Sequence, residues 1–314
     1  NALTPGMIAT VRKAIADFES DPAISAIAID GAGERGLCSG ADVRAIREEI
    51  LTHGPEAAGE FWRTEYAMNA EIHALSTPYA AFMDGVVMGG GVGISTYGSI
   101  RVTTSRTRLA MPETGIGLFP DVGTMFTLSR APGQLGTHMA LTGLPVSGAD
   151  AVIAGFADAV VDPQSWEDLL EALSQGATRE EALATVGANT APEGEIAGQD
   201  WMAECYQGDD AQTIIDRLRS HTHPDAQAAG EVIESRSPLS VVVTLKALRR
   251  AETLPTLDAV LDQDLTLAAA FTKDSDFLEG VRAVLVDKDN APQWRHAGVD
   301  QVSADELETF FRSL

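Results

Sequence analysis

The stretch PYAAFMDGVVMGGGVGIS, from Pro78 to Ser95, decides the fold class. Its first part, Pro78 to Met83, is a short apolar run of the length and composition of a buried strand. A glycine cluster follows at Met88–Gly93, and the chain then has helical character from about Gly91 to Tyr97. A buried strand that leads through glycines into a helix is typical of α/β proteins.

Strand and helix patterns alternate on both sides of this stretch. Apolar residues at helical spacing predict helices, and short apolar runs next to turn residues predict strands. The predicted helices are 5–18, 42–51, 57–75, 240–251 and 257–271, and the predicted strands are 23–29, 78–83, 100–103, 108–110 and 157–161. Thr4 and Pro5 suit the N-cap and the first position of the first helix. We therefore predict an α/β core over residues 1–235 and a helical region over residues 236–314.

The composition excludes several classes of partner. The chain has 22 Lys and Arg against 46 Asp and Glu, a formal charge of -24, so it repels nucleic-acid phosphates and anionic lipid. Cys38 and Cys205 are far apart and are expected to be free thiols in a reducing compartment. No apolar run reaches about 18 residues and no signal-peptide pattern opens the sequence, so we expect a cytoplasmic protein. The six histidines show no ligand spacing, and no metal site is predicted.

Two glycine-rich junctions could bind a ligand through the backbone. MGGGVG, at 88–93, has the wrong spacing for a dinucleotide-binding loop. Its glycines permit either close packing of a helix on a strand or exposure of N–H groups to a ligand oxygen. In LCSGADV, at 37–43, Ser39 or Asp42 could simply cap the next helix, or the loop could present a second set of free amides. Cys38 has no accompanying histidine or nucleophile elbow, so we discount nucleophilic catalysis there.

A third stretch, MPETGIGLFPDVG at 111–123, places Glu113 and Asp121 among apolar residues. Its glycines and prolines prevent a regular helix, so both acids are expected on loops or turns. Two interpretations stay open. The acids are either ordinary exposed turn residues, or buried carboxyl groups whose pKa is raised as general acid–base chemistry requires.

Taken together, GLCSGADVRAI, PYAAFMDGVVMGGGVGIS, AMPETGIGLFPDVG and FLEGVRAVLVDKDNAPQW resemble the crotonase (enoyl-CoA hydratase/isomerase) superfamily, and more narrowly its 3-hydroxyisobutyryl-CoA hydrolase branch. The resemblance covers essentially the whole chain and is weakest between about residues 165 and 230. It implies a spiral of ββα units with a C-terminal helical region. Members usually begin with a strand pair before the segment that starts here at Asn1, so N-terminal strands are expected to be missing from this sequence.

The resemblance also implies the site. The backbone N–H groups of Ala41 and Gly90 would form an oxyanion hole for a thioester carbonyl. The residues that would act in catalysis are Glu113, Asp121 and Glu65. The residues that would line the path of CoA and substrate are Leu37, Ser39, Asp42 and Val43. Read without the resemblance, Glu65 is an ordinary exposed helix acid.

One departure from the superfamily favours hydrolysis. Hydratases carry a glutamate at the position of Gly93 and use two glutamates to add water to a double bond, whereas this chain keeps only Glu113 and adds Asp121. The resemblance thus implies hydrolysis of 3-hydroxyisobutyryl-CoA, as in valine breakdown, with CoA as part of the substrate and no metal or redox cofactor. The alternatives are an enoyl-CoA hydratase or isomerase and a non-catalytic acyl-CoA binding protein. Superfamily members often assemble through their helical ends, which leaves open a homo-oligomer.

Overall fold

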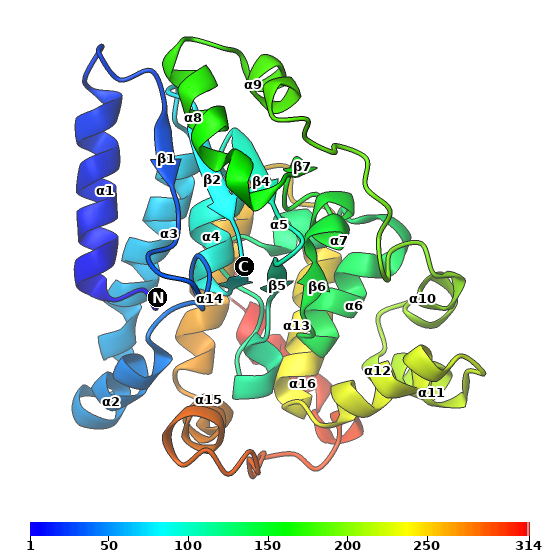
Figure 1. Cartoon of the computed structure of the whole chain (residues 1–314). Coiled ribbons are helices and arrows are strands. Elements are labelled where there is room, and N and C mark those ends of the chain that lie inside the picture. The colour runs from blue at the N-terminus through cyan, green and yellow to red at the C-terminus, as the bar shows by residue number, and fades with distance from the viewer. Residues whose placement is uncertain (313) are drawn as a thin grey trace. The chain divides into compact units, whose positions relative to one another are not determined.

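The computed structural model of the chain describes residues 1–312 and 314, which divide into two compact units (Figure 1). Unit 1 consists of Asn1–Ala41, Thr64–Ala110 and Pro145–Ala197. Unit 2 consists of Asp42–Arg63, Met111–Leu144 and Gly198–Leu314. Each unit is therefore assembled from three separate stretches of sequence. The division into residues 1–235 and 236–314 stays a prediction about the superfamily architecture.

Unit 1 contains two sheets, counted over the described residues. The four-stranded sheet is parallel throughout and has the order β1 (Ile27–Ile29), β2 (Tyr79–Met83), β4 (Ile100–Thr103) and β7 (Ala159–Val160). In the smaller sheet β3 (Val86–Met88) is parallel to β5 (Arg108–Ala110), which is antiparallel to β6 (Val146–Ser147). Parallel neighbours need long crossover connections, which helices provide here, so the predicted α/β class is confirmed.

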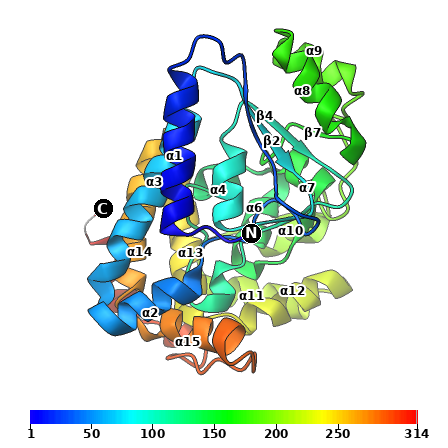
Figure 2. The ribbon, with the colours of Figure 1, turned by 60° about the vertical axis from the view of Figure 1, so that its left-hand side comes forward.

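Helices cover both faces of the parallel sheet. On one face, Ala80, Ile100 and Val102 belong to a buried apolar cluster with Trp166 of α8 (Trp166–Ser174). The same cluster includes Leu183 of α9 (Arg179–Thr185), and Figure 2 shows this helix pair beside β4 and β7.

On the opposite face, the hydroxyl of Tyr79 donates to the carbonyl of Ile94 in α4 (Gly90–Thr96) at 3.0 Å. Alternate residues of β2 thus point to opposite faces, as strand geometry requires.

The remaining helices of unit 1 precede or follow these strands. Thr4 caps the first helix by accepting a hydrogen bond from the Met7 N–H at 3.2 Å, and Pro5 occupies its first turn, as predicted. These helices are α1 (Pro5–Glu19), α3 (Gly59–His73, whose first turn belongs to unit 2), α7 (Gly148–Ile153) and the 3-10 turn η4 (Pro163–Ser165).

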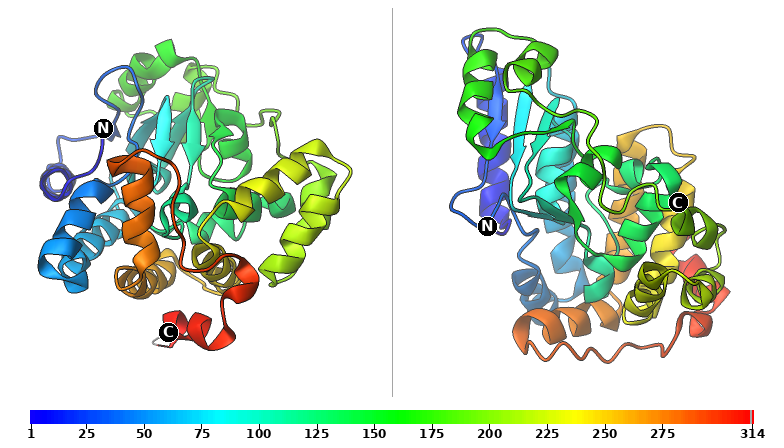
Figure 3. Two further views of the ribbon diagram at one scale, coloured as in Figure 1. Left: turned by 90° about the horizontal axis from the view of Figure 1, so that it is seen from below. Right: turned by 45° about the vertical axis from the view of Figure 1, so that its right-hand side comes forward.

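The described part of unit 2 is helical. Its central helix, α13, buries ten of its residues, and α11 and α12 lie side by side, as Figure 3 shows. The α-helices are α2 (Val43–His53), α5 (Met125–Leu128), α6 (Leu135–Thr142), α10 (Asp200–Cys205), α11 (Ala211–Ser220), α12 (Pro224–Glu234), α13 (Pro238–Ala251), α14 (Leu257–Phe271), α15 (Ser275–Val281) and α16 (Ala304–Phe311). The shorter turns are η1 (Pro55–Ala58), η2 (Glu113–Ile116), η3 (Pro132–Gln134), the π-helical η5 (Arg282–Val286) and η6 (Val299–Gln301).

The structure corrects some of the predicted boundaries. The predicted strand 23–29 is confined to its last three residues, because Asp21 forms a turn in which its side chain accepts from the Ala23 N–H and its carbonyl from the Ile24 N–H. Strands β3 and β6 and the helices between 199 and 234 were not predicted. Over the described residues, no helix combines the length and apolar character that a bilayer-spanning segment needs. Both cysteines are buried free thiols, as predicted.

Candidate active site

Unit 1 brings the amides of Ala41 and Gly90 together. A Cβ placed on Gly90 would lie 3.5 Å from the Ala41 nitrogen, and a Cβ on Gly40 would lie 3.6 Å from the Gly90 nitrogen. The chain reaches this arrangement through positive φ at Gly40 (+100°) and Gly89 (+51°), which glycine adopts without steric cost.

Neighbouring amides donate within the chain, whereas the Ala41 and Gly90 amides make no bond to a backbone carbonyl of the described residues. The Gly89 N–H donates to the Ala110 carbonyl at 3.2 Å, and the Gly40 N–H donates to Cys38 Sγ at 3.4 Å. In the part of the chain that the structure describes, neither the Ala41 nor the Gly90 amide donates to a backbone carbonyl. Gly90 is the first residue of α4, where N–H groups have no intrahelical acceptor. The two amides thus lie close together, and their joint donation to one oxygen atom stays a prediction.

Glu65 lies beside this amide pair. Its side chain comes from α3 and is only 1% exposed, so the interpretation as an exposed helix acid is wrong. A Cβ on Gly90 would lie 2.4 Å from Glu65 Oε1, so a larger residue at this position would have to displace the buried carboxylate. The same carboxylate acts on Cys38, whose thiol pKa is raised mainly by burial and further by the charge of Glu65. This thiol is held in its neutral form and is a poor nucleophile.

The other residues expected to line the CoA path lie at the junction between Leu37 and Val43. Leu37 is buried, and Ser39 is exposed, with its hydroxyl donating to the Asn1 carbonyl at 2.9 Å. Asp42 caps α2, since its Oδ1 accepts from the Ala45 N–H at 3.2 Å, and Val43 opens that helix. The capping role proposed for Asp42 is thus confirmed, and its role toward CoA stays a prediction.

Unit 2 holds the acidic loop, by which we mean residues 111–123. Glu113 is 6% exposed and Asp121 is 4% exposed, so both are buried rather than ordinary surface turn acids. Glu113 opens the turn η2, and that turn ends at Gly117 with φ +72°. Phe119, between the two acids, stacks on Phe271 of α14 with ring centroids 5.4 Å apart.

Gly117 fixes this loop against α15. A Cβ at Gly117 would lie 2.2 Å from the carbonyl oxygen of Asp276, so the two backbones touch directly. The carboxylate of Asp276 in turn accepts from the Ser237 hydroxyl at 2.6 Å, and the Ser237 N–H donates to the Thr114 carbonyl at 3.1 Å. The turn that carries Glu113 is therefore held at both ends by fixed backbone.

The structure adds one acid that was not predicted. Asp264 of α14 is 0% exposed, and its Oδ2 accepts from the Gly123 N–H at 2.7 Å. Its pKa is raised well above the usual value, mainly by burial and further by the charge of Asp121, while the Gly123 hydrogen bond acts in the opposite direction. A signal was present in the sequence: Asp264 occupies the apolar face of its helix, four residues after Val260 and seven before Phe271.

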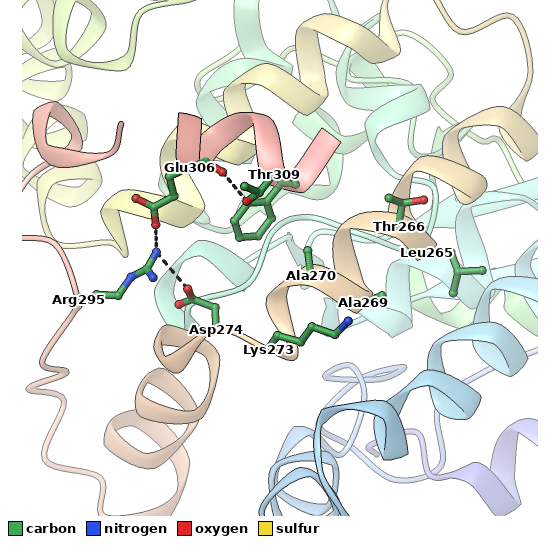
Figure 4. Close-up of a pocket in the computed structure, with 10 residues that line it drawn as sticks. Leu265, Thr266, Ala269, Ala270, Lys273, Asp274, Arg295, Glu306 and Thr309 are labelled. Carbon is green, nitrogen blue, oxygen red and sulfur yellow. Dashed lines mark hydrogen bonds and ion pairs between the residues drawn. The ribbon is translucent and has the colours of Figure 1, made fainter. Parts of the chain in front are cut away.

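Unit 2 also has a hollow of about 830 Å³, which Figure 4 shows. Its walls come from α14, α16 and the segment around Arg295, which forms ion pairs with Asp274 (3.2 Å) and Glu306. None of the predicted site residues lines it. This hollow is therefore not the predicted site.

The chain is similar to known proteins along its whole length. The profile described as enoyl-CoA hydratase/isomerase matches residues 1–311. The mitochondrial 3-hydroxyisobutyryl-CoA hydrolase of Rattus norvegicus is 38% identical over 328 aligned positions, which cover 100% of this chain and 84% of the rat protein. The corresponding Homo sapiens protein is 37% identical, with 100% of this chain and 83% of the human protein covered.

Two solved structures share the fold at high similarity. A carnitinyl-CoA dehydratase from Mycobacterium thermoresistibile has a TM-score of 0.92 and 44% identity, covering 99% of this chain and 89% of that chain. An enoyl-CoA hydratase from Rhodobacter sphaeroides has a TM-score of 0.91 and 34% identity, covering 98% of this chain and 90% of that chain. The relatives of this chain thus include proteins named as a hydrolase, a hydratase and a dehydratase, and the residues of this chain have to distinguish between these activities.

Proposed function

The chain belongs to the enoyl-CoA hydratase/isomerase family, and on that premise we propose that it hydrolyses a short branched β-hydroxyacyl-CoA thioester, namely 3-hydroxyisobutyryl-CoA. The observation that carries the proposal is the full-length similarity to relatives named 3-hydroxyisobutyryl-CoA hydrolase. The products are the free hydroxy acid and CoA.

We assign the developing negative charge on the thioester oxygen to the amides of Ala41 and Gly90. Hydrolysis of a thioester passes through a tetrahedral intermediate whose oxygen carries that charge. Two fixed N–H groups stabilise it without reorganisation, and losing one such donor typically costs about 3–4 kcal/mol of transition-state stabilisation. The closeness of the two amides in unit 1 supports this role.

We assign the cleavage itself to Glu113. Its carboxylate either takes a proton from water as the water attacks the carbonyl carbon, or attacks that carbon directly. In the second route the C–S bond breaks, CoA leaves as a thiolate that takes up a proton, and water then cleaves the acyl–glutamyl anhydride. We assign Asp121 to the substrate hydroxyl and Glu65 to support of the bound substrate, since all three acids are buried.

A single turnover in H₂¹⁸O detects the anhydride route when water attacks the glutamyl carbon, since only that attack labels Glu113. If water attacks the substrate carbonyl, ¹⁸O enters only the product. If an anhydride forms and water attacks its glutamyl carbon, a peptide containing Glu113 gains about 2 Da, as read by mass spectrometry.

Gly93 favours hydrolysis over water addition or elimination, the reactions after which the two structural relatives are named. Reversible hydration of a double bond needs an acid and a base on the substrate, which hydratases of this superfamily supply with two glutamates. Gly93 is buried in α4 and has no side chain to give, so the second group is absent at that position. Thioester hydrolysis needs one carboxylate and an oxyanion hole.

The direct test is release of free CoA from 3-hydroxyisobutyryl-CoA, followed with a thiol reagent. We expect turnover by the wild-type protein, loss of at least about 10³-fold in kcat for Glu113→Gln, and no change for Glu167→Gln, an exposed acid on α8. Loss of enoyl absorbance from crotonyl-CoA without CoA release would instead establish a hydratase. Tight binding of acyl-CoA with no product would indicate a binding protein, and full activity of Glu113→Gln would remove Glu113 from the mechanism.

The proposal also covers cofactors, pathway, cellular location and oligomeric state. We propose that CoA enters only as part of the substrate and that no metal or redox cofactor takes part, because carboxylates and amides suffice for this chemistry. A role in valine breakdown follows if the substrate is 3-hydroxyisobutyryl-CoA. The rat and human relatives are named as mitochondrial, so the predicted cytoplasmic location needs cell fractionation. Light scattering would show whether the chain forms a homo-oligomer.

A further inference from the structure

Asp264 is a buried carboxyl group to which the proposed mechanism gives no role. It comes from the apolar face of α14, beside Val260, Leu267 and Phe271, and is fully shielded from solvent. Its Oδ2 accepts from the Gly123 N–H at 2.7 Å, while its Oδ1 has no hydrogen-bond partner among the described residues. A buried charge with an unsatisfied oxygen is strongly unfavourable, so this group is best accommodated with a proton on Oδ1.

The hydrogen bond reaches a strained part of the acidic loop. Val122, directly before Gly123, has φ +51°, a conformation that is a genuine outlier for a β-branched residue. Such strain persists only where the surrounding contacts impose it. On one side the carbonyl of Asp121 accepts from the Thr124 N–H (3.0 Å) and hydroxyl (2.7 Å), and on the other Asp264 holds the Gly123 N–H.

The charges around Asp264 favour its neutral form. Burial raises its pKa most, and the negative charge of Asp121 raises it further. The guanidinium of Arg250, on α13, donates to the side-chain oxygen of Gln263, the residue before Asp264, at 2.8 Å. Helix α5 also contacts α14 and has no titratable side chain. The acids on α15 have partners: Asp276 accepts a hydrogen bond from Ser237, and Glu279 forms an ion pair with Arg282. On α16, Glu306 forms an ion pair with Arg295 and Glu308 with Lys246. Glu56 of η1 forms an ion pair with Lys273. Among the described residues, Asp121 is the charged group that raises the pKa of Asp264.

We propose that Asp264 is a positioning residue for the acidic loop: its carboxyl group holds the Val122–Gly123 turn and so fixes the direction in which the Asp121 carboxylate points. The inference rests on the proposed function, which gives Asp121 the substrate hydroxyl. Asp264 itself touches no reacting atom. It acts through the backbone of the two residues that follow Asp121.

Three variants test the inference. Asp264→Asn keeps an oxygen for the Gly123 N–H and is neutral at every pH. Asp264→Leu removes the acceptor and leaves a similar volume. Asp262→Leu is the matched control, because Asp262 is exposed on the same helix. We expect Asp264→Asn to keep kcat within about threefold, Asp264→Leu to lower it at least about tenfold, and Asp262→Leu to change nothing.

A pair of substrates separates positioning from a general loss of structure. Isobutyryl-CoA lacks the hydroxyl assigned to Asp121. Asp264→Leu should therefore lose most of the wild-type preference for 3-hydroxyisobutyryl-CoA over isobutyryl-CoA in kcat/KM, and Asp264→Asn should retain it. An equal loss on both substrates, or Asp264→Asn as impaired as Asp264→Leu, would overturn the inference.

Hydrogen exchange gives a readout that needs no turnover. The Gly123 amide should stay protected in Asp264→Asn and exchange at least about tenfold faster in Asp264→Leu, with the rest of α14 unchanged. If wild-type protein hydrolysed no thioester while this difference was present, the proposed function would fail and the positioning of the loop by Asp264 would stand. Unchanged protection in Asp264→Leu would refute the positioning itself.

Discussion

Replacement of Gly117 by alanine tests how the acidic loop is held. Gly117 and Gly133 are both in unit 2 and have similar backbone angles, φ +72° and +59°. An alanine at either position would lower the free energy of unfolding by about 1–2 kcal/mol, because it must adopt the left-handed conformation. At Gly133 a Cβ meets nothing within 4 Å, whereas at Gly117 it would lie 2.2 Å from the oxygen and 2.3 Å from the carbon of the Asp276 carbonyl. Backbone of α15 cannot step aside as a flexible side chain can.

Comparing Gly117→Ala with Gly133→Ala therefore isolates the free-energy cost of the clash between the alanine Cβ and the Asp276 carbonyl. Overpacking of this kind typically costs about 1–3 kcal/mol beyond the conformational penalty. We expect Gly133→Ala to lower the free energy of unfolding by about 1–2 kcal/mol and Gly117→Ala by about 2–5 kcal/mol, measured by urea denaturation with unchanged m-values. Gly117→Ala should also lower kcat, because Glu113 opens the turn that Gly117 ends, and Gly133→Ala should not. Equal destabilisation of the two variants within about 0.5 kcal/mol would refute the close backbone contact.

Three further predictions follow from other contacts. Gly90→Ala keeps the backbone N–H but places a Cβ 2.4 Å from Glu65 Oε1, so the Glu65 carboxylate must shift. We expect kcat to fall about 10²-fold while the circular dichroism spectrum is retained, and near-normal activity would separate the position of Glu65 from catalysis. Asp150→Ala removes the carboxylate that accepts from the N–H groups of residues 195–197 at 2.9–3.2 Å, so the free energy of unfolding should fall by about 1–3 kcal/mol and those amides should exchange faster; unchanged exchange would contradict this. The pKa of Glu19 is lowered from 4.5 to about 2, mainly by the hydrogen bond from the Ser76 hydroxyl. The Glu19 carboxylate therefore stabilises the folded state fully above pH 4.5, and this contribution is lost as the pH falls toward 2. The unfolding midpoint of Glu19→Gln should therefore lie below that of wild type at pH 6 and approach it toward pH 3, and a constant difference across this range would exclude the assignment.

Local chemistry made much of the fold predictable. The first helix was predicted from Thr4 and Pro5 and is found with that cap, and the strand 100–103 was predicted with its exact bounds. Strands β3 and β6 were missed because each is defined by its pairing with β5 rather than by its own composition. The helices between 199 and 234 carried a readable signal, since Ile214, Ile215 and Leu218 form a buried stripe in α11.

The candidate site was predicted only in part, where neighbouring residues in the sequence indicated burial. Apolar neighbours pointed to burial of Glu113 and Asp121, and the structure confirms that burial. The burial of Glu65 was not readable from its helix, whose pattern mixes polar and apolar residues on several faces. The burial of Asp264 was readable from the apolar face of its helix, but its contact with Gly123, 141 positions earlier in the chain, was not readable from any local pattern.

The interleaved make-up of the two units has a consequence for biosynthesis. The stretches of unit 1 are all present once Ala197 has left the ribosome, whereas unit 2 still lacks the stretch that begins at Gly198. We therefore expect the sheets of unit 1 to fold while residues 42–63 and 111–144 are still unfolded loops. The apolar residues of 111–144 would then be exposed to chaperones. Translation pauses shortly after residue 197 should affect the yield of folded enzyme more than pauses within either loop.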